Sequence, residues 1–184
     1  MPQVVTRAQL ASHIGQLAMR GQRCVLVIDG YPGSGKTTLA MALARQPGVA
    51  WAPLDGYRLG ESFDFKKLNR DLLKPFRKRG RVREVRPVNP LNRSGPMRLG
   101  DRRPHPAAVL VLEGMHAAQA FDLLGGDFLC WVDCEREQRI ARVDAREVVG
   151  GTFVELREWI EQAERTGLRE FAMPIAQFVL DTSR

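Results

Sequence analysis

The stretch from Gly30 to Thr37 constrains the fold of this chain more than any other part of its sequence. It reads Gly-Tyr-Pro-Gly-Ser-Gly-Lys-Thr and satisfies every fixed position of the pattern G-x-x-x-x-G-K-[ST]. A short apolar run (23–29) precedes it, and a stretch rich in alanine and leucine (37–45) follows it. A glycine-rich loop between a buried strand and a helix lets successive backbone N–H groups converge on phosphate oxygens. The sequence therefore predicts a phosphate-binding loop, and an ordinary glycine-rich turn is the weaker interpretation.

Within this loop, two side chains have definite expected tasks. Lys36 would neutralise the β- and γ-phosphate oxygens of a nucleoside triphosphate, and the hydroxyl of Thr37 would bind Mg²⁺. The loop residues that we expect to contact the nucleotide are Gly30, Tyr31, Pro32, Gly33, Ser34, Gly35, Lys36, Thr37 and Thr38. A GTPase would also need a guanine-reading Asn-Lys-x-Asp motif, which the sequence lacks.

Apolar runs of strand length alternate with helical patterns along the whole chain. The expected strands are 23–29, 49–54, 107–113, 127–133 and 176–181. The expected helices are one that begins after Thr6 and those at 37–45, 63–78, 135–147 and 153–166, with Pro75 ending or kinking the third. This alternation is typical of an α/β fold with a mainly parallel sheet. At 184 residues we expect one domain, which covers residues 1–184.

Three carboxylates follow or end predicted strands on the same edge as the phosphate loop. Glu113 ends the strand at 107–113 and could hold Mg²⁺ or its water, although it could also be a surface carboxylate. Asp55 follows the strand at 49–54 and could activate an acceptor hydroxyl, or it could simply form an Asp-Gly turn. Asp29 directly precedes the loop and is the weaker candidate, since it could only brace the loop.

A set of arginines follows the fourth predicted strand. Arg139, Arg142 and Arg146 lie near positions i, i+3 and i+7 of one helical face and could cover a transferring phosphoryl group. The alternative is a solvated helix face on which they pair with Glu135 and Glu147.

The net charge of +7 is concentrated in one segment, residues 74–103. This basic segment could surround an anionic acceptor, because guanidinium groups bind phosphates and carboxylates in a bidentate manner. A nucleic-acid partner is less favoured, since no aromatic side chain lies between Phe76 and Phe121 to stack on bases. A solvated surface loop is the third interpretation. The cations of the segment are Lys74, Arg77, Lys78, Arg79, Arg81, Arg83, Arg86, Arg93, Arg98, Arg102 and Arg103.

Several classes of protein do not fit the sequence. No apolar run approaches the roughly 18 residues that a membrane-spanning helix requires, and the N-terminus does not have the pattern of a secretory signal. The three cysteines, Cys24, Cys130 and Cys134, indicate buried or half-buried thiols in a reducing cytoplasm instead of a disulfide framework or a zinc site. His105 and His116 are expected to be structural.

Beyond the loop motif, an ordered set of pieces resembles the uridine kinase, phosphoribulokinase and pantothenate kinase family of P-loop kinases. The likeness runs from about residue 22 to the end of the chain, and the whole set is more specific than the loop alone. The run Asp55-Gly-Tyr-Arg is nearer to the Asp-Gly-Phe type of pantothenate kinases than to the Ser-Phe-Tyr type of uridine kinases. The matching pieces are residues 27–40, 54–57, 63–65, 68, 72–75, 111–114, the segment with Arg139 and Arg142, and 178–181.

The resemblance implies a three-layer P-loop kinase fold with a five-stranded parallel sheet and helices on both faces. It also implies ATP and Mg²⁺, with Asp55 as the base that deprotonates the acceptor hydroxyl. Arg139 and Arg142 would belong to a lid at about 136–152, and an acceptor-side excursion would occupy 80–106. The implied reaction transfers the γ-phosphate to an alcohol group of a nucleoside, sugar, sugar phosphate or pantothenate-like acid. A P-loop protein that binds nucleic acid through residues 74–103 is the alternative, and the choice of acceptor, ATP or GTP, and monomer or homodimer stays open.

Overall fold

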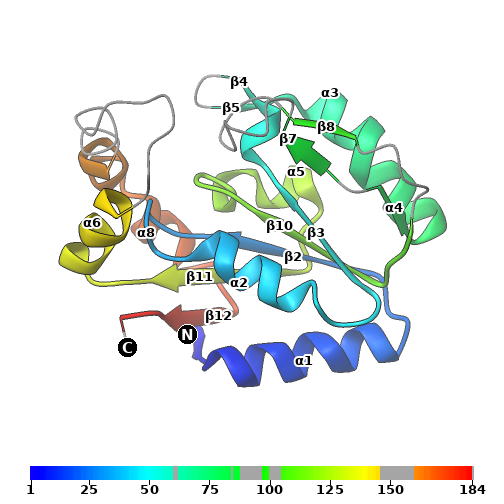
Figure 1. Ribbon diagram of the computed structural model, residues 1–184, viewed down its shortest axis with the longest axis horizontal. Helices are drawn as coiled ribbons and strands as arrows, with labels where there is room; N and C mark the ends of the chain where they lie inside the picture. Colours follow the sequence, from blue (N-terminus) through cyan, green and yellow to red (C-terminus); the bar gives the residue numbers. More distant parts are fainter. Residues whose placement is uncertain (60–61, 84, 88–96, 100–104, 146–159, 184) are drawn as a thin grey trace.

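Six parallel strands form the central sheet of the part of the chain that the structure, a computed structural model, describes (Figure 1). The described residues are 1–59, 62–83, 85–87, 97–99, 105–145 and 160–183. In spatial order the strands are β1 (Gln3–Val4), β12 (Phe178–Asp181), β11 (Phe128–Asp133), β2 (Cys24–Asp29), β10 (Val109–Glu113) and β3 (Val49–Pro53). The five expected strands are all present, each within its predicted range.

The count of five strands needs a correction, because β1 adds a sixth at the edge of the sheet. β1 has only two residues and no apolar run, so no sequence pattern marks it. It becomes a strand by pairing with β12, with Gln3 opposite Phe178 and Val4 opposite Val179. The backbone N–H of Val5 extends this pairing with a 2.9 Å hydrogen bond to the carbonyl of Val179.

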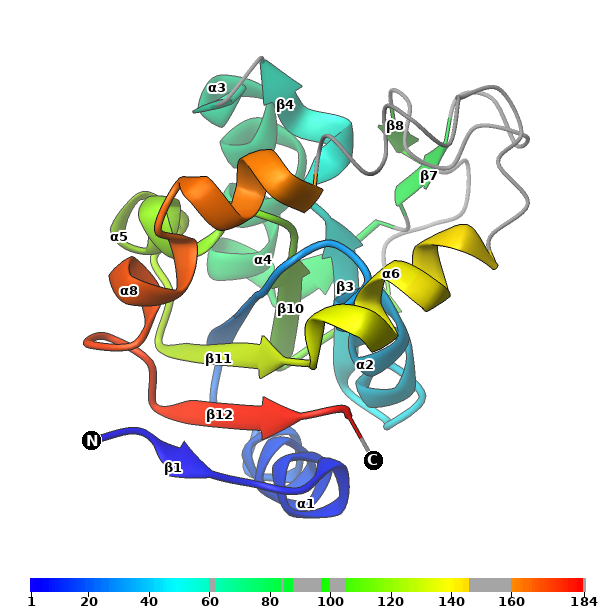
Figure 2. The same ribbon diagram turned by 90° about the vertical axis from the view of Figure 1, so that its left-hand side faces the viewer.

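Helices cover both faces of the sheet and make three layers (Figures 1 and 2). Helices α1 (Arg7–Met19) and α2 (Lys36–Leu43) pack on one face. The strand residues alternate between the two hydrophobic clusters, as the two-residue period of a strand requires. In β2, for example, Leu26 and Ile28 face α1 and α2, whereas Val25 and Val27 face the opposite cluster.

The first helix begins as the sequence predicts. The Thr6 hydroxyl accepts a hydrogen bond from the backbone of Gln9 at 3.2 Å, and the Gln9 side chain accepts one from the backbone of Thr6 at 2.8 Å. This reciprocal capping satisfies two of the N–H groups that the first turn of a helix leaves unpaired. Leu10, Ile14 and Leu17 form the apolar stripe of this helix and are buried against the sheet.

The expected helix at 63–78 consists of three consecutive helical segments on the other face of the sheet. They are α3 (Phe65–Leu68), the π-helical η2 (Asn69–Leu73) and α4 (Lys74–Arg79). Pro75 therefore does not end the helix. Because proline has no N–H to give to the preceding turn, the wider π-helical turn directly before it accommodates the ring.

The expected irregular excursion at 80–106 contains short antiparallel strand pairs where it is described. β6 (Arg81–Val82) pairs with β9 (His105–Pro106), and β7 (Val85–Pro87) pairs with β8 (Met97–Leu99). A third small pair, β4 (Arg58–Leu59) and β5 (Ser62–Phe63), follows the short 3-10 turn η1 (Asp55–Tyr57).

The chain after β10 is mainly helical. η3 (Ala118–Ala120) and α5 (Phe121–Leu124) precede β11, and α6 (Arg136–Asp144) follows it. Residues 160–165 are helical, in agreement with the end of the expected helix at 153–166, and α8 (Leu168–Ala172) leads to β12. Residues 146–159, and with them Arg146 and most of the expected lid beyond α6, lie outside the described residues. Among the helices described, none is both long and apolar enough to cross a membrane.

Candidate active site

The phosphate loop joins the carboxyl end of β2 to the first residue of α2, as the sequence predicts. Gly33 has a φ of 78°, and Gly35, which directly precedes α2, has a φ of 96°. These are conformations that side-chain-bearing residues rarely adopt. At Gly33 there is also no room for a side chain, because a Cβ atom would lie 2.5 Å from the carbonyl oxygen of Arg139. The loop is therefore a tight turn packed under α6.

Lys36 curls back over the loop that precedes it. Its Nζ donates hydrogen bonds to the carbonyl oxygens of Gly30 at 2.8 Å and Tyr31 at 3.0 Å. The positive charge is therefore held at the loop, where the sequence predicts that phosphate oxygens bind.

Thr37 and Glu113 meet across the sheet edge. The Thr37 hydroxyl donates to Glu113 Oε1 at 3.2 Å, although the two residues come from α2 and from the end of β10. Glu113 is buried, with 3% of its surface exposed. A hydroxyl and a carboxylate side by side are oxygen ligands of the kind that Mg²⁺ prefers. The described residues contain no group of three or more His, Cys, Asp or Glu side chains that could hold a metal alone. This fits Mg²⁺, which is usually held by one or two protein oxygens together with phosphates and waters.

Asp29 braces the phosphate loop, the structural role that the sequence analysis gave as the alternative to a catalytic one. Its fully buried carboxylate accepts hydrogen bonds from the backbone of Gly30 at 2.7 Å and of Ala118 at 2.9 Å. Burial raises the pKa of Asp29 to about 6, and these hydrogen bonds and nearby Lys36 oppose the rise. The carboxylate therefore ties the loop after β2 to the turn after β10. That turn includes His116, whose φ of 68° is unusual for a residue other than glycine and whose backbone also bonds to Asp29.

Asp55 lies at the same edge of the sheet, two residues beyond β3. Pro53 in β3 is the register partner of Glu113 in β10, and Leu54 donates to the carbonyl of Glu113 at 2.8 Å. The turn at Asp55 is closed by a backbone hydrogen bond from Tyr57 to Leu54 at 2.9 Å. No hydrogen bond or ion pair joins the Asp55 carboxylate to another described residue. The backbone therefore closes this turn without a hydrogen bond from the Asp55 side chain.

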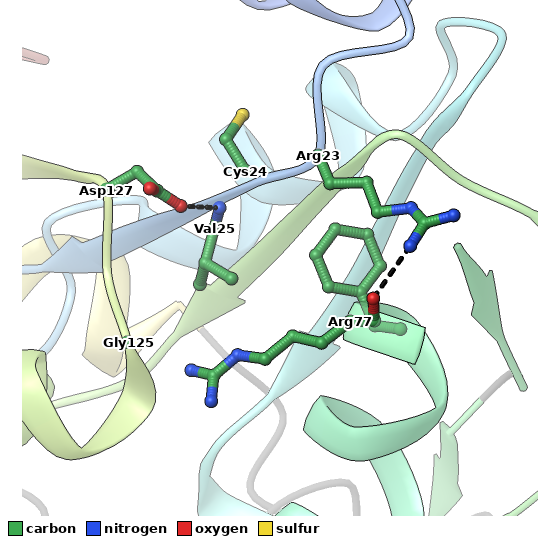
Figure 3. Close-up of a pocket in the computed structure, with 7 residues that line it drawn as sticks. Arg23, Cys24, Val25, Arg77, Gly125 and Asp127 are labelled. Atoms are coloured by element: carbon green, nitrogen blue, oxygen red, sulfur yellow. Dashed lines mark hydrogen bonds between the residues drawn. The ribbon is translucent and has the colours of Figure 1, made fainter. Parts of the chain in front are cut away.

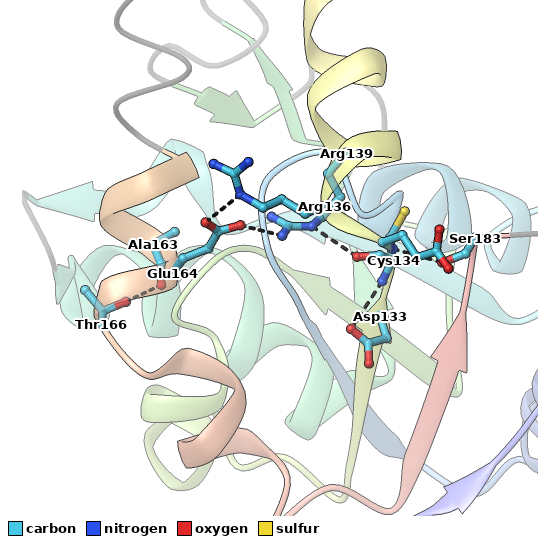
Figure 4. A network of polar contacts seen from close by, with 9 residues as sticks. Asp133, Cys134, Arg136, Arg139, Ala163, Glu164, Thr166 and Ser183 are labelled. Carbon is cyan, nitrogen blue, oxygen red and sulfur yellow. Dashed lines mark hydrogen bonds and ion pairs between the residues drawn. The ribbon is translucent and has the colours of Figure 1, made fainter.

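Arg139, on α6 beside the loop, already has bonding partners (Figure 4). Its guanidinium donates to Glu164 at 2.5 Å and to the carbonyl of Cys134 at 3.1 Å, and it stacks on the Tyr31 ring with 4.7 Å to the ring centroid. Arg136 donates to the other oxygen of Glu164 at 3.1 Å. Only 4% of the Arg139 surface is exposed, which excludes a solvated helix face for this residue.

Arg142 points to the phosphate loop and to the end of β12. Its Nη2 donates to the carbonyl of Thr182 at 2.6 Å, and its Nη1 donates to the Thr182 hydroxyl at 3.0 Å and approaches the carbonyl of Gly33 at 3.5 Å. The same Thr182 hydroxyl donates to the carbonyl of Ser34 at 2.7 Å. Arg142 and Thr182 together hold the outer side of the loop. Sequence reasoning missed Thr182 and Glu164, because a single threonine or glutamate carries no motif.

The part of the basic segment that forms α4 lies away from this site. α4 ends beside Arg23, whose Nη1 donates to the carbonyl of Arg77 at 2.7 Å. Arg23 precedes β2, so Arg77 lies at the amino edge of the sheet, opposite the phosphate loop. The reason is length, since a helical run from Phe65 to Arg79 covers about 1.5 Å per residue and carries the chain from one edge to the other. The β7–β8 hairpin, by contrast, lies near the candidate site, because β8 packs against η1, the turn that contains Asp55.

Two buried polar atoms fit the binding of a nucleotide at this edge. Ser34 Oγ, in the loop, and Arg139 Nη1, on α6 beside it, are buried and have no hydrogen-bond partner among the described residues. Buried polar groups in proteins are nearly always paired, so such orphans point to a missing partner. A phosphate-bearing ligand would supply acceptors for both.

No protein-family model and no curated protein matches the sequence. Solved structures do match the fold. One, from Silicibacter sp. TM1040, is provisionally described as a fructose transport system kinase; it has a TM-score of 0.60 and 19% identity, with 92% of this chain and 98% of that chain covered. The YGR205w protein has a TM-score of 0.54 and 14% identity, with 95% and 92% covered. YFH7 from Saccharomyces cerevisiae, provisionally described as a P-loop kinase with a circular permutation, has a TM-score of 0.53 and 14% identity, with 97% and 99% covered.

The chain has the three-layer α/β fold of P-loop kinases, which is the fold that the sequence resemblance implied. At these identities the likeness is one of fold, and the roles of individual residues rest on the geometry described above.

Proposed function

We propose that this chain uses MgATP to phosphorylate a hydroxyl group of a small molecule. The observation that carries the proposal is the meeting of three groups at one edge of the sheet. They are the phosphate loop with Lys36, the Thr37–Glu113 pair at 3.2 Å, and the carboxylate of Asp55 beyond the neighbouring strand. In parallel α/β sheets, ligands bind at the carboxyl ends of the strands, where these groups lie.

Each group has a task in phosphoryl transfer. The backbone of the loop and Lys36 bind the phosphates and offset their negative charge. Thr37 and Glu113 would hold Mg²⁺, which would supply positive charge to offset the negative charge that develops on the phosphates. Asp55 accepts the proton of the acceptor hydroxyl while the oxygen of that hydroxyl forms a bond to the γ-phosphorus. The bond from that phosphorus to the β–γ bridging oxygen breaks, and ADP leaves.

The acceptor is proposed to be anionic, such as a sugar phosphate or a carboxylated metabolite. The support comes from the β7–β8 hairpin, which packs against η1 and therefore lies beside Asp55. The hairpin carries two arginines, Arg86 and Arg98, which are cross-strand register partners. Lys74 to Arg81 have no part in this proposal, because α4 leads to the opposite edge.

The experiment on the reaction is an ATP-consumption screen across nucleosides, sugars, sugar phosphates and pantothenate-like acids, followed by the Asp55→Asn variant on the best acceptor. General-base catalysis contributes about 10²–10⁴-fold, so we expect turnover to fall by that factor while ATP affinity changes by no more than a few-fold. Equal turnover in a folded Asp55→Asn protein would remove Asp55 from the chemistry.

The acceptor charge is tested by a matched pair of variants in the basic segment. Arg98→Gln removes a cation of β8, the strand that packs against η1, and Arg79→Gln removes an exposed cation at the other edge. Loss of one charge-assisted hydrogen bond costs about 1.5–3 kcal/mol, so Arg98→Gln should raise the acceptor KM about 10- to 150-fold. Arg79→Gln should leave it unchanged, and both variants should keep the KM for ATP. Equal effects of the two substitutions would contradict an anion pocket at the hairpin.

A further inference from the structure

A cavity of about 420 Å³ lies at the amino edge of the sheet, opposite the phosphate loop (Figure 3). Its volume is within the range of small-molecule sites. The residues around it come from the start of β2, the end of α4 and the turn before β11. They are Arg23, Cys24, Val25, Phe76, Arg77, Gly125 and Asp127.

Two arginines from distant parts of the chain line this cavity, and their guanidinium groups point away from each other (Figure 3). Arg23 Nη1 donates to the carbonyl of Arg77 at 2.7 Å, and Arg77 Nη2 donates to the carbonyl of Leu124 at 2.7 Å. Both guanidinium groups are therefore positioned by neutral backbone oxygens. Neither forms an ion pair with any described residue. A guanidinium carries five N–H donors, so most donors of both groups remain available.

The surroundings strengthen the positive charge. Lys74, Lys78 and Arg79 are exposed on the same helix, and Arg81 follows it. Cations in the last turn of a helix are common because they offset the helix dipole, and that effect accounts for Lys78 and Arg79. The helix dipole does not explain why Arg23, which precedes β2, lines the same cavity as Arg77 of α4.

The opposing groups at the cavity are few. Asp127 is the single carboxylate among its lining residues, and its Oδ2 accepts a hydrogen bond from the backbone of Val25 at 2.7 Å. Cys24 also lines the cavity, and burial raises the pKa of its thiol to about 11, so it stays neutral at physiological pH. Gly125 leaves room for the guanidinium, because a Cβ atom there would collide with Arg77 Nη2.

We propose that Arg23 and Arg77 form a second anion site at the amino edge of the sheet, which binds a phosphate-bearing small molecule. The planar guanidinium fork matches the oxygens of a phosphate group, and two separated forks at one cavity favour an anion with two phosphate groups over a single carboxylate. This site shares no residue with the phosphate loop. It therefore stands whether or not the chain is a kinase.

The proposal is tested with inorganic pyrophosphate as the probe and residue-resolved NMR of the full chain. We expect saturable shifts of the backbone amides of Val25, Gly125 and Asp127. Binding at the phosphate loop is read separately from the amides of Gly33 and Gly35. Lys36→Ala should weaken the shifts of the loop amides of Gly33 and Gly35 and leave the shifts at the amino edge unchanged.

Variants then identify the groups responsible. Arg77→Gln and Arg23→Gln should each weaken the pyrophosphate affinity at the amino edge about tenfold to a hundredfold. Arg77→Lys, which keeps the charge and loses the fork, should weaken it less. Arg7→Gln removes an exposed cation at the start of α1 and should have no effect, which controls for the loss of overall charge.

Three results would overturn the proposal. One is the absence of saturable shifts at Val25, Gly125 and Asp127, and another is an unchanged affinity in a folded Arg77→Gln protein. The third is preferential binding of an oligonucleotide whose affinity falls steeply with salt. That result would assign the surface to a nucleic-acid backbone instead of a small anion.

Discussion

The Thr182 hydroxyl offers the sharpest test of how the phosphate loop is held. Thr182→Val keeps the shape of the side chain and removes only its hydrogen-bonding capacity. In the structure Thr182 is 1% exposed, its hydroxyl donates to the carbonyl of Ser34 at 2.7 Å, and it accepts from Arg142 Nη1 at 3.0 Å. The variant leaves the buried carbonyl of Ser34 without this donor, whereas Arg142 keeps its 2.6 Å bond to the Thr182 carbonyl.

The magnitude follows from the loss of one buried partner. An unpaired buried acceptor costs about 1–3 kcal/mol. For a domain of this size, each kcal/mol shifts the melting temperature by about 2–4 °C, so we expect Tm to fall by about 2–12 °C. MgATP affinity should also weaken, because the loop loses a hydrogen bond that holds its conformation.

Thermal unfolding and calorimetric titration with MgATP measure the two effects, with Thr182→Ser as the control. The serine variant keeps the hydroxyl and loses only a methyl group, so the Thr182→Val protein should be the less stable and the weaker binder. If the two variants unfold within about 0.5 kcal/mol of each other, the hydroxyl does not support the loop, and the reasoning is wrong.

Three further predictions concern the same edge of the sheet. Lys36→Ala should abolish measurable MgATP binding and leave the circular dichroism spectrum unchanged, and retained affinity would remove the basis of the proposed function. Gly33→Ala should destabilise the protein by more than Gly21→Ala in chemical denaturation, because both positions have a positive φ but only Gly33 meets the carbonyl of Arg139. Partial burial pushes the pKa of Glu164 up, but hydrogen bonds from two arginines outweigh it and lower the pKa below its ordinary value of 4.5. The ion pair therefore stabilises the fold above about pH 4.5 and is lost as the pH falls through the lowered pKa. The Tm difference between wild type and Glu164→Gln should be full at pH 7 and vanish in acid, and a constant difference would contradict the ion pair.

Elements that carry their own pattern could be predicted from the sequence. The predicted strand at 107–113 is apolar up to its last residue, Glu113, and β10 within it is buried throughout, while the phosphate loop has a fixed spacing of glycines and lysine. Thr6 marks the start of α1 because its capping partner is only three residues away. In each case the information lies within a few consecutive residues.

Features that depend on distant partners could not be predicted. β1 is a strand only because β12 lies beside it, and Glu164 matters only because α6 brings Arg139 to it. The described parts of the basic segment are the opposite case, because α4 and the β7–β8 hairpin are close in sequence and yet separate in space. Arg77 lies at the amino edge, and the hairpin with Arg98 lies beside Asp55.

The hydrogen bond from Thr182 to Ser34 joins residues 148 positions apart, and this separation has a consequence for synthesis. At about 5–20 residues per second, a ribosome makes the second partner about 7–30 s after the first. During that interval the nascent chain already carries the complete phosphate-loop sequence, but the carbonyl of Ser34 lacks its brace. Maturation of the nucleotide site is therefore a late event of biogenesis, set by when β12 joins the sheet and not by when the loop is translated.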